Sequence, residues 1–92
     1  EVIQGGIVAT LIDHGGGAAI RTTLERPREM THATTELNVS YLRPATGDLT
    51  AEATVVRSGR TRGVVEVEVT TERPEGTKEV AVGRVSLFLD RE

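Results

Sequence analysis

Two glycines and one aspartate near the start of the chain have the types and the spacing that carbonyl chemistry needs. Gly5 and Gly6 open an apolar segment of helical length, and Asp13 follows two helical turns later. Backbone N–H groups at a helix start lack intrahelical partners, and glycine lets a ligand approach them closely. A carbonyl oxygen could be stabilised there while a carboxylate attacks the carbonyl carbon or deprotonates a water. An ionised Asp among apolar neighbours is costly to bury unless it is paired or used.

The glycine pair and the carboxylate cannot meet on a single helix. Gly5 and Asp13 are separated by a helical rise of about 12 Å, whereas both must lie about 3 Å from the reacting atom. They meet if two antiparallel helices place Gly5 of one subunit beside Asp13 of the other. An active site here therefore predicts a dimer. The alternative for Asp13 is a structural ion pair with a buried arginine such as Arg84.

The composition bounds the class of protein. A chain of 92 residues with 37% apolar residues and only two aromatic side chains, Tyr41 and Phe88, is one domain with a thin core, which again favours a dimer. A net charge of −3 argues against a nucleic-acid or anionic-membrane surface. The sequence has no cysteine, which excludes disulfides and thiolate chemistry. Without an apolar run of membrane-spanning length or a signal-like segment, a cytoplasmic protein is expected.

Hydrophobic periodicity predicts one helix followed by four strands. The helix runs from about Gly5 to Thr22 and is apolar on more than one side, which is typical of a buried helix. The run Gly15-Gly16-Gly17 weakens it by about 1 kcal/mol per residue, unless a sheet or a symmetry mate packs closely there. After a charged loop at 25–29, alternating residues predict strands at about 35–41, 49–55, 65–70 and 80–89, with turns at 44–48 and 73–78. Short connections predict an α+β fold in which a curved antiparallel sheet wraps a central helix.

Three stretches, at 5–14, 38–45 and 57–61, occur in the order and spacing of a known family. Together they resemble hotdog-fold acyl-CoA thioesterases of the phenylacetate-degradation type, within the 4-hydroxybenzoyl-CoA thioesterase superfamily. The resemblance runs along essentially the whole chain. It implies that residues 1–92 form a single hotdog thioesterase domain that lacks the family's N-terminal strand and loop.

The resemblance also implies roles for individual residues. Asp13 would be the nucleophile or general base, and the N–H of Gly5 would polarise the thioester carbonyl from the facing subunit. Thr34 would lie near the attacking water, although strand propensity alone also explains a threonine there. Gln4 stands where the family usually has His, and its amide can still donate a hydrogen bond.

The basic turn Arg57-Ser58-Gly59-Arg60 would lie near the pyrophosphate and adenine end of coenzyme A. Arginine suits phosphate through its bidentate fork, and the alternative is a solvated hairpin turn. Coenzyme A is part of the substrate, and we expect no separate cofactor. We also expect no metal, because His14 and His32 are the only histidines and no carboxylate spacing completes a site. His14 is assigned a structural or interface role.

These residues predict an acyl-CoA thioesterase that acts as a homodimer, with dimers pairing into tetramers. The first alternative is a non-catalytic acyl-CoA binding module, which Gln4 in place of His favours. A third interpretation, a hotdog dehydratase or hydratase, needs a histidine paired with an acidic residue at the site.

Overall fold

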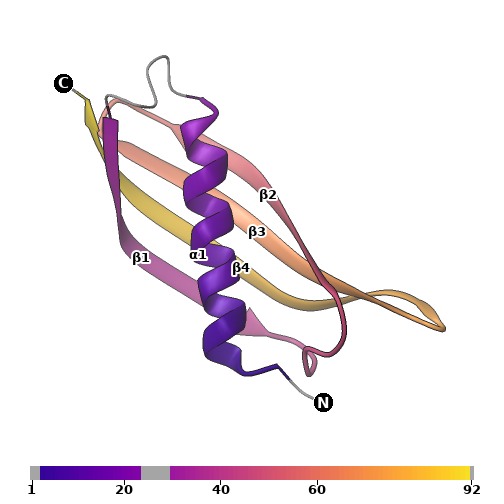
Figure 1. Ribbon diagram of the computed structural model, residues 1–92. Helices are drawn as coiled ribbons and strands as arrows, with labels where there is room; N and C mark the ends of the chain where they lie inside the picture. The colour runs from indigo at the N-terminus through magenta and orange to yellow at the C-terminus, as the bar shows by residue number, and fades with distance from the viewer. Residues whose placement is uncertain (1–2, 24–29, 92) are drawn as a thin grey trace.

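One helix lies across one face of a curved four-stranded antiparallel sheet in the computed structural model, which describes residues 3–23 and 30–91 (Figure 1). The elements in chain order are α1 (Gly5–Arg21), β1 (Met30–Tyr41), β2 (Leu49–Ser58), β3 (Arg62–Arg73) and β4 (Gly76–Arg91). The strand order is β1-β4-β3-β2, so that β1 and β2 form the two edges. This arrangement is the predicted hotdog fold.

The helix has nearly the predicted bounds, whereas every strand is longer than predicted. α1 begins at Gly5 and ends at Arg21. Thr22, the residue after the helix, donates a hydrogen bond of 2.6 Å from its hydroxyl to the carbonyl of Ala19. β1 begins at Met30, before the alternating pattern starts. The predicted turn at 73–78 is mostly strand, because Arg73 pairs directly with Gly76. The predicted loop at 25–29 lies outside the described residues.

No helix of the described ranges is long and apolar enough to cross a membrane.

The core lies between α1 and the sheet face that it covers. Its helix residues are Val8, Ile12 and Ile20, all at most 1% exposed. They pack on buried strand residues, namely Val65, Val67, Val69, Val80, Ala81, Val85, Leu87 and Leu89. The thin aliphatic core is thus built almost wholly from Val, Leu and Ile.

Close packing explains the glycine run in α1. A Cβ atom on Gly16 would lie 2.8 Å from Cγ2 of Val85, and one on Gly17 would lie 3.0 Å from Cε1 of His32. A Cβ on Gly15 would meet Val67 at an ordinary 3.9 Å. The sheet therefore approaches the helix backbone at the second and third glycines, which is one of the two explanations that the sequence left open.

The expectation of a helix that is buried on more than one side is met only on the side that faces the sheet. Ile7 is 59% exposed and Ala18 is also exposed, because they lie on the side of α1 that faces away from the sheet. In this single chain, nothing covers that side among the described residues.

Candidate active site

Asp13 and Thr34 meet in the space between α1 and β1. The hydroxyl of Thr34 donates a hydrogen bond of 2.6 Å to Oδ1 of the half-buried Asp13. This contact fixes one carboxylate oxygen, and among residues 3–23 and 30–91 no side chain donates a hydrogen bond to the other. A cavity of about 320 Å³ opens beside the pair, and its other lining residues are His14, Gly17, Ala18, Arg21 and His32.

A β-bulge aims Thr34 at the helix. The pairing of β1 with β4 shifts register between Thr34 and Glu36, which leaves Thr35 as the extra residue. Thr34 pairs with the buried Leu87, and Leu37 pairs with the buried Val85. Both side chains therefore share the helix-facing side although they are three residues apart. Bulges commonly re-aim a side chain next to an active site.

The glycine pair Gly5 and Gly6 forms the first two residues of α1. Gln4 is the residue before the helix, and its carbonyl accepts the N–H groups of Ile7 at 3.0 Å and Val8 at 3.3 Å. The side chain of Gln4 makes no capping hydrogen bond and is exposed. Within one chain, the structure therefore brings Thr34 to Asp13 but does not bring Gly5 or Gln4 to them, because a helical rise of about 12 Å separates the two groups.

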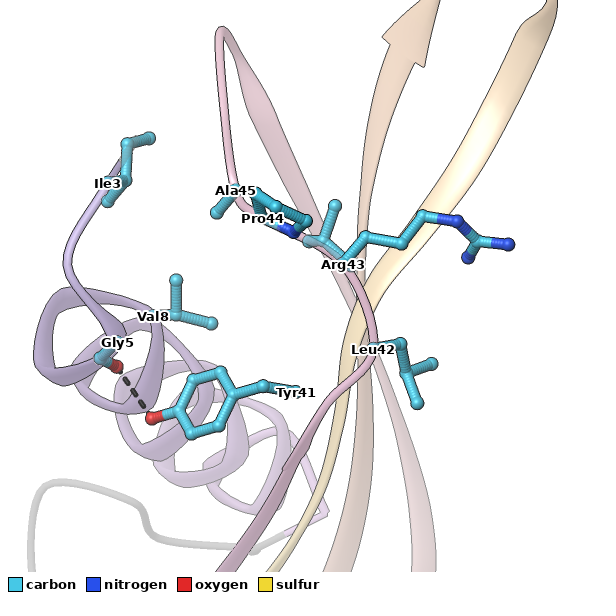
Figure 2. A pocket seen from close by; sticks show the side chains of 9 residues that line it. Ile3, Gly5, Val8, Tyr41, Leu42, Arg43, Pro44 and Ala45 are labelled. Carbon is cyan, nitrogen blue, oxygen red and sulfur yellow. Dashed lines mark hydrogen bonds between the residues drawn. The ribbon is translucent and has the colours of Figure 1, made fainter. Parts of the chain in front are cut away.

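A second cavity, of about 420 Å³, lies beside Gly5 (Figure 2). Tyr41, the last residue of β1, points its ring at the helix start, and its hydroxyl donates to the carbonyl of Gly5 at 2.7 Å. The rest of the lining is largely apolar and consists of Ile3, Val8, Leu42, Arg43, Pro44, Ala45 and Val80.

Arg57 lies among the last residues of β2, and Arg60 lies in the connection between β2 and β3. Both are near the end of α1. The hydroxyls of Ser58 and Thr23 are 2.7 Å apart, and the N–H of Gly59 donates to the carbonyl of Arg62 at 2.8 Å. The turn is thus tied to the residues that follow the helix. Gly5, Asp13 and this turn are distributed along the start, the middle and the end of α1.

The alternative role for Asp13, an ion pair with Arg84, is wrong. Arg84 pairs with Glu66 at 3.0 Å, and both side chains are 54% exposed. Gly83 faces Ile12 of the helix, so Arg84, the next residue in the strand, points to the outer face of the sheet. Asp13 instead takes its hydrogen bond from Thr34.

Acidic side chains gather on that outer face, away from the cavity beside Asp13. A hydrogen bond with Glu79, together with the negative charge of Glu79, raises the pKa of Glu68, and the carboxylates of Glu52 and Glu66 add to the effect. Within residues 3–23 and 30–91, no group of three His, Asp or Glu side chains could hold a metal ion.

Two features of the site escaped the sequence analysis. His32 lines the cavity beside Asp13, two residues before Thr34 on the same strand, and Tyr41 contacts Gly5. His32 stands two residues before Thr34, so the two side chains share a face once the strand is known to extend to Met30. Tyr41 lies in one of the stretches that resemble the family, but nothing local in the sequence shows which end of the helix it meets.

The geometry defines the chain as a hotdog-fold domain with a carboxylate on its central helix. The sequence profile of the thioesterase superfamily matches residues 1–78, and the chain belongs to that family.

Individual proteins show the same likeness. A relative from Halobacterium salinarum, whose name assigns it provisionally to the esterases, is 53% identical over 98% of this chain and 62% of its own length. A crystal structure of a Bacillus halodurans protein with CoA superposes with a TM-score of 0.84 at 38% identity, over 97% of this chain and 56% of that one. A thioesterase from Haemophilus influenzae gives a TM-score of 0.83 at 28% identity, over 98% and 60%. The chain thus spans about three fifths of the length of these proteins.

Proposed function

We propose that this chain is an acyl-CoA thioesterase domain, formed by residues 1–92, in which Asp13 is the catalytic base. The observation that carries the proposal is the hydrogen bond from Thr34 to Asp13 beside an open cavity. The thioesterase family of the chain and the CoA in the Bacillus structure support the choice of substrate. We assign the domain to the phenylacetate-degradation type within this proposal, because Asp13 follows the glycine pair by two helical turns.

The reaction would proceed by addition of water to the thioester carbonyl. Asp13 takes a proton from the water while the water oxygen bonds to the carbonyl carbon. The negative charge moves to the carbonyl oxygen. When the C–S bond breaks, that charge returns to re-form the carbonyl, and the thiolate of coenzyme A leaves with the proton from Asp13. The products are the free acid and coenzyme A. In this account Thr34 holds the carboxylate in place.

Direct attack by Asp13 is the other route, and it would leave an acyl anhydride on the enzyme. Hydrolysis of that anhydride at the aspartyl carbon would transfer an oxygen of water to Asp13. A single turnover in ¹⁸O-labelled water, followed by mass spectrometry of the protein, separates the routes, because only direct attack can label Asp13.

The proposed site is completed by a second copy of the chain. Asp13 and Thr34 of one subunit would face Gly5 and Gln4 of its partner, whose backbone N–H and amide groups would stabilise the carbonyl oxygen. Three features support a homodimer: Ile7 is 59% exposed on the open side of α1, β1 is an edge strand, and Leu37 on that edge is 37% exposed. Edge strands are ready templates for pairing with another chain. Pairing of dimers into tetramers is part of the same proposal.

We place the phosphates of coenzyme A at Arg57, Ser58, Gly59 and Arg60. The turn lies close to the helix end, about 12 Å of helical rise beyond Asp13. A pantetheine arm is long enough to cover such a distance. Arginine forks bind phosphate in a bidentate manner.

A non-catalytic acyl-CoA binding module is the second candidate, and Gln4 is the observation that favours it. An amide cannot take or give a proton as an imidazole can. Such a module would bind coenzyme A esters through the same turn and would not need Asp13.

Thiol release from short, medium, long and aromatic acyl-CoA thioesters tests the proposal, with the wild type and Asp13→Asn measured in parallel. We expect turnover by the wild type and a loss of more than about a hundredfold in Asp13→Asn, the scale of a removed general base. The Thr10→Val variant, which changes an exposed helix residue that lines neither of the two cavities, is the matched control and should keep its activity. Binding of the esters without turnover in any variant would favour the binding module.

A further inference from the structure

Tyr41 makes a hydrogen bond that the helix does not need for its own stability. Its hydroxyl donates to the carbonyl of Gly5 at 2.7 Å (Figure 2). In a regular helix this carbonyl already accepts the N–H of the residue four positions later. The side chain of Tyr41 is 54% exposed, so burial did not force its hydroxyl to find a partner.

The bond acts on one particular peptide group. The carbonyl of Gly5 and the N–H of Gly6 belong to the same peptide, and hydrogen bonds in a chain polarise one another. A donor on the carbonyl therefore makes the N–H of Gly6 a stronger donor. The preceding peptide has the same arrangement, because the carbonyl of Gln4 accepts from Ile7 and Val8, which strengthens the N–H of Gly5.

Neither of these two N–H groups has a hydrogen-bond partner among the described residues. The residue types also keep the approach to them open. Among the described residues, a Cβ on Gly6 would meet nothing within 4 Å, so packing against that part of the chain does not explain a glycine there. Glycine in a helix costs about 1 kcal/mol relative to alanine, and an unobstructed N–H is a reason to bear that cost.

Gly5 has a different constraint, because the ring of Tyr41 lies against it. A Cβ on Gly5 would lie 3.2 Å from Cζ of Tyr41 and 3.3 Å from its hydroxyl oxygen. The missing side chain at Gly5 thus lets Tyr41 reach the backbone. The two glycines therefore have separate explanations: Gly5 makes room for Tyr41 of the same chain, and Gly6 leaves its N–H open to a ligand.

We propose that Tyr41 is a positioning residue, which fixes and polarises the Gly5–Gly6 peptide so that the N–H of Gly6 joins that of Gly5 as a second donor to the thioester oxygen. This inference rests on the proposed function. The two donors hold the negative charge that develops on the carbonyl oxygen when water adds, and release it when the C–S bond breaks. Tyr41 does not touch the substrate, and acts through the peptide.

Tyr41→Phe is the direct test, because it removes the hydroxyl and keeps the ring against Gly5. A donor in such a site is worth about 100- to 1,000-fold in kcat, and polarisation strengthens a hydrogen bond by about 10–30%, which corresponds to a loss of about two- to eightfold. We expect this loss in kcat. The dissociation constant of a non-hydrolysable S-alkyl-CoA thioether, in which CH₂ replaces the thioester carbonyl, should not change, because it has no carbonyl oxygen that gains charge.

Thr10→Val is the matched control. The hydroxyl of Thr10 also donates to a carbonyl of the first turn, that of Gly6 at 2.9 Å. The N–H of that peptide belongs to Ile7 and is already bonded to Gln4. Loss of this hydroxyl should therefore leave kcat unchanged, although the number of bonds removed from the helix start is the same.

A second measurement uses the fact that Tyr41 is the only tyrosine among the 92 residues. Growth on fluorotyrosine replaces its phenol by a more acidic and stronger donor, at an assay pH where that phenol stays protonated. The proposal predicts that kcat rises from Tyr41→Phe to the wild type and again from the wild type to the fluorinated protein.

Equal kcat for Tyr41→Phe and wild type, or an equal loss in Thr10→Val, would overturn the role of Tyr41 while leaving the thioesterase proposal intact. A loss expressed only in KM would overturn it as well. Absence of turnover by the wild type on every thioester would instead refute the proposed function, and the inference with it.

Discussion

Thr34 and Asp13 are joined by a 2.6 Å hydrogen bond that depends on a single extra residue in β1. Without the bulge at Thr35, strict alternation from Leu37 would place Thr35 toward the helix and Thr34 on the outer face. The bulge therefore determines which of two adjacent threonines meets the carboxylate.

Thr34→Ala should lower kcat by about ten- to hundredfold, since a hydrogen bond to a charged group contributes about 1.5–3 kcal/mol. Thr34→Ser keeps the hydroxyl and should retain most of the activity. Thr35→Ala is the matched control, because the hydroxyl of Thr35 donates instead to the carbonyl of Ser86 at 3.1 Å. Steady-state thiol release decides the matter, and similar losses in Thr34→Ala and Thr35→Ala would speak against the bulge argument.

Adjacent glycines of α1 should respond to alanine in opposite ways. Gly16→Ala should lower the free energy of unfolding by about 1–3 kcal/mol, the usual cost of overpacking, because its Cβ would lie 2.8 Å from Val85. Gly15→Ala should raise it by up to about 1 kcal/mol through helix propensity, because its Cβ has ordinary contact with Val67 at 3.9 Å. Urea unfolding of both variants measures the two changes, and equal effects would contradict the described packing.

The stability of the chain should depend on the ionisation of Glu68. Since the pKa of Glu68 lies above its ordinary value of 4.5, the folded chain binds more protons than the unfolded chain, and stability falls as the pH rises through this window. Glu68→Gln should therefore raise the free energy of unfolding at pH 7 and change it little at pH 4.

The partner carboxylate provides the control for Glu68. Glu79→Gln should have a similar effect, and the double variant should gain less than the sum, because both substitutions relieve the same repulsion. Added salt should reduce the gain by screening these exposed charges. A gain from Glu68→Gln that is equal at both pH values would exclude the electrostatic cause.

Much of the fold could be predicted from local patterns, because helix and strand periodicities record which faces are buried. The apolar spacing of Val8, Ile12 and Ile20 is enough to place α1, and the alternation of Val65, Val67 and Val69 is enough to place β3. Strand ends were harder to predict, since pairing with β4 extends β1 to Met30, where the alternating pattern is absent.

The site was predictable only in its parts. Asp13 stands out as a carboxylate in an apolar helix, and Gly5 and Gly6 stand out at its start. The meeting of Asp13 with Thr34 depends on a bulge that no turn residue announces. The contact of Tyr41 with Gly5 joins residues that are 36 positions apart, and only the sheet register brings them together.

In the proposed dimer, each active site takes Asp13 from one subunit and the N–H of Gly5 from its partner. Two variants separate these contributions. Asp13→Asn removes the carboxylate. Gly5→Pro removes the N–H and also displaces Tyr41, because a Cβ on Gly5 would lie 3.2 Å from Cζ of Tyr41, and both effects fall on the Gly5 half of the site. Proline is well tolerated at the first position of a helix, and Gln4 has the extended backbone, with φ of −61° and ψ of 143°, that a residue before proline prefers.

Mixing the two variants after reversible unfolding measures this claim directly by thiol release. Each variant alone should be nearly inactive. Random re-association should make about half of the dimers mixed, each with one intact and one doubly defective site, so that about a quarter of the wild-type activity returns. If both groups came from the same subunit, the mixture would stay as inactive as its components, and the shared site would be refuted.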